Sequence, residues 1–349
     1  MTNNINIGKI KEERKGDIMR IASDKRYYDM KYNRCGKSGL KLPAMSLGLW
    51  QNFGDKDNYQ NMEDMIYTAF DLGVTHFDLA NNYGPKPGAA ETNFGIILKN
   101  GLKQYRDELV ISTKAGYDMW PGPYGDKNGS RKYLTASLDQ SLTRMGLDYV
   151  DIFYHHVFDP ATPLEETVLA LDNAVKQGKA LYVGISNYGT EQTKEAIEMF
   201  KQLKTPFIIN QPSYSILNRW IERDSLIDLA RKEGMGLIVY SPLFQGLLTD
   251  KYITGIPTDS RVGKGNGIWL KDDVNPETIS KVIQLNEIAQ ERGQSLAQMA
   301  LSWVLKDSTI TSVLIGASRP EQIAENVSAI HNTNFSDNEI CLIDKITNM

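Results

Sequence analysis

Four kinds of acid–base side chain occur near the ends of short apolar runs in this sequence. Asp78 lies in HFDLA, and Tyr83 follows it five residues later among Asn, Gly and Pro. Lys114 follows VIST, and His155 and His156 follow DIFY. Carboxylate, phenol, amine and imidazole groups are those that enzymes use to move protons. Whether these five side chains can act together depends on the elements that position them.

Short apolar runs rich in β-branched and aromatic residues, bounded by Gly, Asn, Pro or Ser, indicate buried strands. There are eight of them, at residues 44–50, 76–80, 108–115, 148–156, 180–187, 207–214, 236–243 and 311–318. Amphipathic stretches lie between them. One of these, PLEETVLALDNAVKQGK, has acids in its first turn and lysines near its end, which suits the helix dipole. Alternating strands and helices in this number predict an α/β fold of the (β/α)8 TIM-barrel type.

Additional elements are expected at both ends of the barrel. MKYNRCGKSGLKLPA predicts an N-terminal β-hairpin with its turn at Gly36–Gly39, which would plug the N-terminal mouth. SLAQMALSWVLKD predicts an extra helix before the last strand, and SDNEICLIDKITNM predicts a final helix capped by Ser336. A doubly wound sheet is the alternative fold. It would usually carry a glycine fingerprint, and neither GxGxxG nor GxxxxGK[ST] occurs in the sequence.

Composition excludes several classes of function. The net charge of −4 provides no basic field for nucleic acid or anionic lipid. No apolar run approaches the ~18 residues of a membrane span, and the N-terminus lacks the apolar centre of a signal peptide. The two cysteines, Cys35 and Cys341, are far apart, as in a reduced, cytoplasmic protein. The four histidines form no zinc motif, so we expect no metal site.

The sequence predicts an N-terminal extension over residues 1–29 and one barrel domain over residues 30–349. The segment KEERKGDI is polar and without periodicity, which favours partial disorder in the extension. One hypothesis is that this segment is translated leader ahead of a start at Met19, because its residues can be written in purine-rich codons. A native flexible tail is the alternative.

In a barrel of parallel strands, chemistry is found at the C-terminal strand ends. The polar residues expected there are Asp78, Tyr83, Lys114, His155, His156, Ser186, Asn187, Asn210, Gln211, Tyr240 and Ser241. Side chains alternate along a strand, so His156 shares a face with Tyr154 and Ile152, whereas His155 shares the other face with Asp151. Alternation alone does not decide which face lines the barrel.

These residues resemble the Asp–Tyr–Lys–His tetrad of the aldo-keto reductases. The resemblance covers nearly the whole chain through FDLANNYGP, ISTKAGYDMWPGPYG, GISNY, NQPSYS, YSPLFQGLLTDKY and IGASRPEQIAEN. In the family, the active histidine lies five residues after the aspartate of YVDIF, which selects His156. His155 departs from the branch pattern, because a small residue usually stands there. LGLWQNFG, GYDMWPGPYG and QPSYSILNRW resemble a bacterial branch that reduces L-glyceraldehyde 3-phosphate and is similar to the β subunits of voltage-gated potassium channels.

The resemblance implies reduction of a carbonyl by hydride from a nicotinamide, with Tyr83 as the general acid. A free phenol titrates near ~10, and a nearby ammonium lowers that pKa. We therefore expect Lys114 to lower the pKa of Tyr83, and Asp78 to hold Lys114 charged and oriented. His156 would donate a hydrogen bond to the carbonyl oxygen and position it.

The resemblance also implies NADPH as the cofactor. Arg319, in the first turn of a helix predicted after the last strand, suits an adenosine 2′-phosphate. Residues expected to bind the cofactor are Trp50, Asp78, Ser186, Asn187, Gln211, Tyr240, Ser241, Leu243, Gln245, Gly246, Lys251, Gly316, Ser318, Arg319, Gln322 and Asn326. Within this set, Ser186, Asn187 and Gln211 match a carboxamide clamp. Tyr240 matches an aromatic residue that stacks on the nicotinamide.

Small aldehydes and 2-oxoaldehydes of the L-glyceraldehyde 3-phosphate and methylglyoxal type are the implied substrates. Trp50 and Trp120 are expected to wall the substrate pocket beside Tyr83 and His156, and Arg131 and Lys132 could attract a phosphate. The branch implies a homo-oligomer, a tetramer or larger. Two other functions stay open: an NADPH-binding auxiliary subunit with slow turnover, and a related barrel enzyme that isomerises or cleaves sugars without NADPH.

Overall fold

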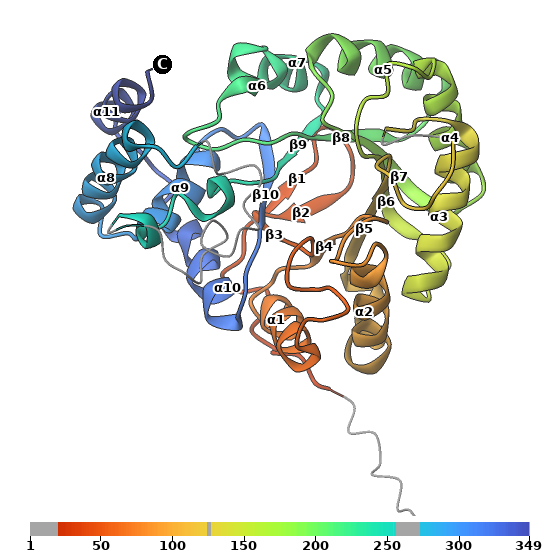
Figure 1. Ribbon diagram of the computed structural model, residues 1–349, viewed down its shortest axis with the longest axis horizontal. Helices are drawn as coiled ribbons and strands as arrows, with labels where there is room; N and C mark the ends of the chain where they lie inside the picture. Colours follow the sequence, from red (N-terminus) through yellow and green to blue (C-terminus); the bar gives the residue numbers. More distant parts are fainter. Residues whose placement is uncertain (1–19, 124–126, 254, 256–272, 349) are drawn as a thin grey trace, which may run out of the picture.

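A closed barrel of eight parallel strands forms the centre of the molecule (Figure 1). The computed structural model describes residues 20–123, 127–253, 255 and 273–348. Around the barrel the strands are β3 (Met45–Gly48), β4 (His76–Asp78), β5 (Val110–Ala115), β6 (Val150–His155), β7 (Ala180–Ser186), β8 (Phe207–Gln211), β9 (Gly236–Val239) and β10 (Ile310–Ile315). Each lies within, or within one residue of, one predicted apolar run, and β10 pairs with β3 to close the ring. The predicted (β/α)8 barrel is confirmed.

Helices cover the outside of the barrel because each presents one apolar face to it. In α5, for example, Thr193, Ala196, Ile197 and Phe200 are buried at helical spacing. The surrounding helices are α1 (Tyr59–Asp71), α2 (Ala89–Ile97), α3 (Arg131–Met145), α4 (Leu164–Lys176), α5 (Thr190–Leu203), α7 (Leu226–Glu233), α9 (Leu296–Val304) and α10 (Pro320–Val327). Shorter helical segments are α6 (Trp220–Arg223), η1 (Leu98–Leu102), η2 (Lys103–Glu108), η3 (Phe244–Gly246), η4 (Asp250–Tyr252) and η5 (Ser328–His331).

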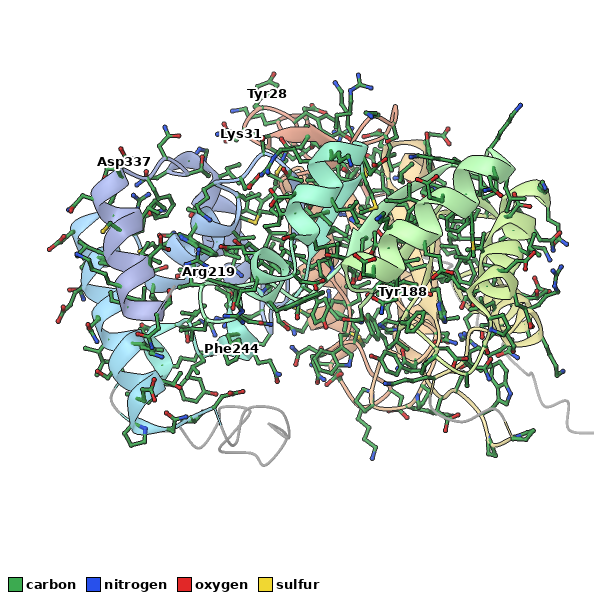
Figure 2. All side chains as sticks on the ribbon, turned by 90° about the horizontal axis from the view of Figure 1, so that it is seen from above. Tyr28, Lys31, Tyr188, Arg219, Phe244 and Asp337 are labelled. Carbon is green, nitrogen blue, oxygen red and sulfur yellow. The ribbon has the colours of Figure 1, made fainter. Side chains whose placement is uncertain are left out.

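The predicted hairpin is present at the N-terminal end of the barrel. β1 (Tyr32–Arg34) pairs antiparallel with β2 (Lys41–Pro43), and the predicted turn lies between them. Cys35 and Leu42 are fully buried against the barrel interior, in one cluster with residues of β6 and β8. Figure 2 shows Lys31, beside the hairpin, on the opposite side of the molecule from Phe244, in the loop after β9. The hairpin therefore closes the N-terminal mouth of the barrel and does not cover the C-terminal mouth.

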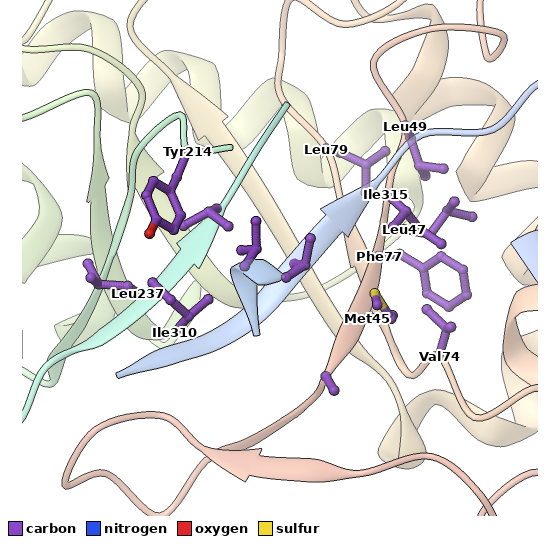
Figure 3. Close-up of a cluster of buried hydrophobic side chains, with 14 of the residues drawn as sticks. Met45, Leu47, Leu49, Val74, Phe77, Leu79, Tyr214, Leu237, Ile310 and Ile315 are labelled. Atoms are coloured by element: carbon purple, nitrogen blue, oxygen red, sulfur yellow. The ribbon is translucent and has the colours of Figure 1, made fainter. Parts of the chain in front are cut away.

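Side chains that point outward from the strands join a large apolar cluster among the described residues. Met45, Leu47, Phe77 and Ile315 from β3, β4 and β10 meet there, beneath the helices (Figure 3). Phe77 lies 5.5 Å from Phe94 of α2, between ring centres. The residues on either side of Phe77 point the other way, because side chains alternate along a strand. His76 and Asp78 thus face the barrel interior.

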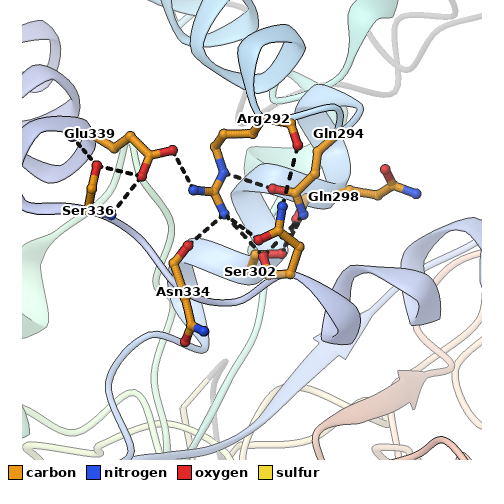
Figure 4. A network of polar contacts seen from close by, with 8 residues as sticks. Arg292, Gln294, Gln298, Ser302, Asn334, Ser336 and Glu339 are labelled. Carbon is orange, nitrogen blue, oxygen red and sulfur yellow. Dashed lines mark hydrogen bonds and ion pairs between the residues drawn. The ribbon is translucent and has the colours of Figure 1, made fainter.

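The predicted C-terminal helices are also present. α8 (Pro276–Glu291) precedes α9, and α11 (Asp337–Thr347) begins after Ser336, which caps it in a capping box with Glu339. Arg292, at the end of α8, donates to Glu339 at 2.6 Å and to the carbonyl of Asn334 at 2.9 Å (Figure 4). One guanidinium therefore joins the end of α8 to the start of α11.

Residues at the start of the described chain pack on the barrel. Arg20 pairs with Asp71 at 2.7 Å, and Arg26 pairs with Glu108 at 2.8 Å. Residues 1–19 lie outside the described residues, so the predicted leader or tail over them, and the division at residue 30, stay predictions. In the described part of the chain, no helix combines the length and apolarity needed to cross a membrane.

We predict that Gly95→Ala lowers stability through helix packing. A Cβ at Gly95 would lie 2.7 Å from the Cα of Met145 and 2.8 Å from the carbonyl oxygens of Arg144 and Met145, so α2 and α3 would have to separate. Overpacking of this kind costs about 1–3 kcal/mol. Thermal unfolding should show a lower Tm for Gly95→Ala. Gly39→Ala is the control, because no described residue other than its chain neighbours has an atom within 4 Å of its Cβ position. Equal Tm values for both variants would contradict the prediction.

Candidate active site

A buried ion pair lies at the C-terminal end of β4 and β5. The Lys114 ammonium donates to Oδ2 of Asp78 and, at 2.7 Å, to the carbonyl of Leu79. The other carboxylate oxygen, Oδ1, accepts from the hydroxyl of Ser112 at 2.7 Å and from the amide of Gln211 at 3.1 Å. Lys114 is fully buried. Both oxygens of the carboxylate are thus hydrogen-bonded, and Lys114 is held by Asp78, as predicted.

Tyr83 lies beside this pair because the loop after β4 turns back toward it. The amide of Tyr83 donates to the carbonyl of Ala80 at 3.1 Å, and the Tyr83 carbonyl accepts from Ala90, near the start of α2, at 3.3 Å. The Lys114 nitrogen lies 5.0 Å from the centre of the Tyr83 ring. The five-residue spacing from Asp78 therefore places the phenol over the ammonium, as the sequence indicated.

The expected lowering of the Tyr83 pKa is not found. Burial raises the pKa of Tyr83 well above its usual range, and the charge of Asp78 raises it further. The Lys114 ammonium is itself hydrogen-bonded to Asp78 and to the carbonyl of Leu79. Burial also lowers the pKa of Lys114, and Asp78 opposes that shift. Tyr83 accordingly rests as a protonated phenol, which is the form that a general acid requires.

The structure separates the two adjacent histidines. His156 lies 5.7 Å from Tyr83 and 4.7 Å from Tyr117, between ring centres and edge-on in each case. His155 points away, with its Nδ1 2.6 Å from the hydroxyl of Tyr188 and its Nε2 3.3 Å from the carbonyl of Asn128. The strand face of His156 is the one that looks into the barrel. His155 thus links β6 to the loop after β7, through Tyr188, and to the loop before α3, through Asn128.

His156 is neutral in this environment. Burial lowers the pKa of His156 well below its usual range, and the positive charge of Lys114 lowers it further. A neutral imidazole has one N–H group, which donates one hydrogen bond, and it carries no net charge. In the described residues its Nδ1 is buried without a hydrogen-bond partner. His156 is thus suited to hold an oxygen atom by a hydrogen bond.

Aromatic side chains surround Tyr83 and His156. Trp50 lies 6.5 Å from Tyr83 between ring centres and is 43% exposed, so it stands at the rim of the site. Trp120 packs 4.9 Å from Tyr133, whose hydroxyl donates to the carbonyl of Tyr117. Tyr117 is the residue that sequence reasoning missed. Its position three residues after Lys114, within ISTKAGYDMWPGPYG, is the feature of the sequence that could have identified it.

The residues predicted to clamp a carboxamide form one hydrogen-bonded group next to His156. Tyr240 donates its hydroxyl to Oδ1 of Asn187 at 2.7 Å, and Asn187 donates to the carbonyl of His156 at 3.0 Å. Ser186 donates to the carbonyl of Gln211 at 2.8 Å. Since Gln211 also donates to Asp78, this group is connected to the ion pair. The Tyr240 ring is held by its hydroxyl.

The loop after β9 contains several of the residues that the resemblance predicts to bind the cofactor. Ser241 and Gln245 have positive φ values of 54° and 55°, a backbone conformation that residues other than glycine rarely adopt. Such backbone is concentrated at functional sites in proteins. The remaining predicted residues of this segment are Leu243, Gly246 and Lys251, of which Lys251 is exposed.

The predicted adenosine end lies at the start of α10. Arg319 precedes the helix as its N-cap rather than lying in its first turn, and its side chain is 57% exposed. Gln322 accepts from the amide of Ser318 at 2.8 Å, which fixes the turn. Asn326 is buried on the same helix. Among the described residues, none but the chain neighbours of Gly316 has an atom within 4 Å of a Cβ position there, so a ligand could approach the backbone.

The barrel and this group of side chains define a class of protein. The aldo/keto reductase family model matches residues 44–348, and the chain belongs to that family. Family membership, with the tetrad side chains brought together at one mouth, supports an oxidoreductase.

Individual relatives agree with this assignment. L-glyceraldehyde 3-phosphate reductase of Escherichia coli K12 is 57% identical over 329 residues, which is 93% of this chain and 94% of that protein. A probable voltage-gated potassium channel subunit beta of Arabidopsis thaliana is 37% identical over 309 residues, or 86% and 91% of the two chains. The chain is thus similar to a reductase over nearly its whole length.

We predict that stability falls in mild acid because of buried neutral histidines. Burial lowers the pKa of His155 from 6.5 to about 4, and that of His76 likewise. Between pH 6.5 and about 4 the unfolded chain binds more protons than the folded one, so the free energy of unfolding falls as the pH is lowered through this range. The stability that the neutral histidines provide is fully present above the range and lost below it. The Tm should therefore drop from pH 7 to pH 5.

A variant isolates the contribution of one histidine. His155→Gln should show a shallower dependence of Tm on pH than the wild type, whatever its Tm at pH 7. His331→Gln is the control, since His331 is exposed and should leave the slope unchanged. A wild-type slope in His155→Gln would show the prediction to be wrong.

Proposed function

We propose that this protein reduces small aldehydes and 2-oxoaldehydes to alcohols with NADPH, and that its substrates are of the L-glyceraldehyde 3-phosphate and methylglyoxal type. The observation that carries the proposal is the buried Lys114–Asp78 pair, with its ammonium 5.0 Å from the centre of the Tyr83 ring. The substrate class rests on the 57% identity to the L-glyceraldehyde 3-phosphate reductase of E. coli K12.

Tyr83 is the proposed general acid. Its phenol is protonated at rest and can give its proton to the carbonyl oxygen as the alcohol forms. The phenolate left behind would be stabilised by Lys114, because opposite charges attract strongly in a buried site. Lys114 thus assists in the step where charge appears on Tyr83, rather than by ionising Tyr83 beforehand. Asp78 keeps Lys114 in place, and we assign it no contact with substrate.

His156 is proposed to orient the carbonyl. Its neutral imidazole lies edge-on to Tyr83, so an oxygen held by one ring can receive a proton from the other. Hydrogen-bond donors fixed before the reaction stabilise charge that develops on the oxygen. Tyr117 and Trp50 restrict the space on two sides, which favours a short aldehyde.

The described residues fit NADPH. When bound, the nicotinamide supplies the hydride for the carbonyl carbon. Ser186, Asn187 and Gln211 would hold its carboxamide, and Tyr240 would offer a flat ring. At the other end, Arg319 is 57% exposed and its nearest carboxylate, Glu321, is 3.6 Å away, so its guanidinium has room for a phosphate.

The first test is NADPH oxidation by the purified protein with L-glyceraldehyde 3-phosphate and with methylglyoxal. Tyr83→Phe should lower kcat by about 100-fold or more, as loss of a general acid does, while binding of NADPH persists. Tyr28→Phe is a matched control, because Tyr28 is 78% exposed and lies near Lys31, on the hairpin side of the molecule (Figure 2). A Tyr83→Phe enzyme with wild-type turnover would eliminate Tyr83 as the acid.

The cofactor assignment has its own test. Arg319→Ala should raise the Kd for NADPH about 10- to 100-fold, because it removes a charge-assisted contact, and should leave the Kd for NADH unchanged. Fluorescence titration measures both constants. Arg34→Ala, in the hairpin at the closed end of the barrel, is the control. Equal losses for NADPH and NADH would argue against recognition of a 2′-phosphate by Arg319.

An NADPH-binding auxiliary subunit is the second candidate, favoured by the 37% identity to a probable potassium channel subunit beta. It predicts tight NADPH binding with very slow turnover of every aldehyde in a carbonyl panel. A sugar isomerase or lyase would show no dependence on NADPH. The inferred homo-oligomer and cytoplasmic location remain predictions, and light scattering measures the first of them.

A further inference from the structure

A second polar layer lies inside the barrel, one layer below the ion pair. It consists of Ser46 on β3, His76 on β4, Ser112 on β5 and Ser312 on β10, all fully buried. The polar layer is enclosed between the site above and the apolar side chains of the hairpin below. Four polar groups in such a place are costly unless each is hydrogen-bonded.

These four residues form one continuous chain of hydrogen bonds. Ser312 and Ser46 are 2.6 Å apart between hydroxyl oxygens, and Ser46 lies 2.9 Å from Nδ1 of His76. Nε2 of His76 lies 2.9 Å from the hydroxyl of Ser112, which donates to Oδ1 of Asp78 at 2.7 Å. The chain therefore ends on the carboxylate that holds Lys114.

The proton positions follow from counting donors. Ser112 spends its one hydrogen on Asp78, so toward His76 it must accept, and Nε2 of His76 must carry a proton. His76 is neutral, because burial lowers its pKa to about 4, with the charge of Lys114 acting in the same direction and that of Asp78 against it. Its Nδ1 therefore accepts from Ser46, and Ser46 in turn accepts from Ser312.

We propose that His76 is a positioning residue for the active site: by donating to Ser112 it forces the Ser112 hydroxyl toward Asp78, and so fixes the carboxylate that orients Lys114 beneath Tyr83. His76 touches no reacting atom. The inference rests on the proposed catalytic function of Lys114 and Tyr83. Without the His76 donor, the Ser112 hydroxyl could turn away, and Asp78 would keep only Gln211 on Oδ1.

Two isosteric variants separate positioning from packing. The side-chain amide of Gln reaches about as far as Nε2 of histidine, so His76→Gln keeps a donor for Ser112. The amide of Asn reaches about as far as Nδ1, so His76→Asn loses that donor. Each variant disturbs one of the two hydrogen bonds of His76, and both should lower Tm.

Turnover of aldehyde should distinguish the two variants. We expect His76→Asn to lower kcat about 10- to 100-fold, since small misplacement of catalytic groups has effects of this size. KM and the Kd for NADPH should stay within about twofold, and the pH profile of kcat should shift. His76→Gln should retain most of the wild-type kcat and its pH profile. Equal kcat values in the two folded variants would overturn the inference while leaving the proposed function intact.

The tautomer of His76 gives a readout that does not depend on turnover. Nitrogen NMR of histidine-labelled protein, with the His76 signal assigned by its loss in His76→Gln, should show a neutral ring protonated at Nε2. A ring protonated at Nδ1, or a charged ring at pH 7, would overturn the inference. Absence of aldehyde turnover in the wild type would instead remove the proposed function, and the catalytic part of the inference with it.

Discussion

The Lys114–Asp78 ion pair is the interaction on which the site depends. Two charges in the barrel interior lose their hydration, and removing one partner would leave the other uncompensated at a cost of about 3–5 kcal/mol. The barrel offsets this loss with hydrogen bonds from Ser112 and Gln211 to Asp78, and from Lys114 to Leu79. The pair is therefore best understood as one unit shared by three strands, and Tyr83 and His156 are arranged around it.

The same constraint explains how the rest of the mouth is organised. Gln211, which donates to Asp78, also accepts a hydrogen bond from Ser186 through its backbone carbonyl. The next residue, Asn187, donates to the carbonyl of His156 and accepts from the hydroxyl of Tyr240. Polar contacts thus join residues at the C-terminal ends of strands between β4 and β9. Because the hairpin fills the opposite mouth, the hairpin and the outer helices can provide stability without entering the chemistry.

Much of the fold could be predicted from the sequence, because short β-branched runs bounded by Gly and Pro have few other interpretations. The choice between His155 and His156 could not. Both faces of a parallel barrel strand are buried, so neither shows the polar alternation that marks solvent. Only the family resemblance selected His156. The pKa of Tyr83 was predicted in the wrong direction, since it is raised chiefly by burial, whose extent the sequence does not give. Tyr117 lies in a loop, where no periodic pattern marks it.

The closed mouth also determines the thiol chemistry of the surface. Cys35 is sealed beneath the hairpin, and burial raises the pKa of its thiol to about 12, so it offers almost no thiolate to oxidants or alkylating reagents. The other cysteine of the chain, Cys341, is exposed on α11. Of its two thiols, the protein therefore presents one to solvent, on a helix outside the barrel. A spectroscopic label or a surface tether can be attached there while every strand remains untouched.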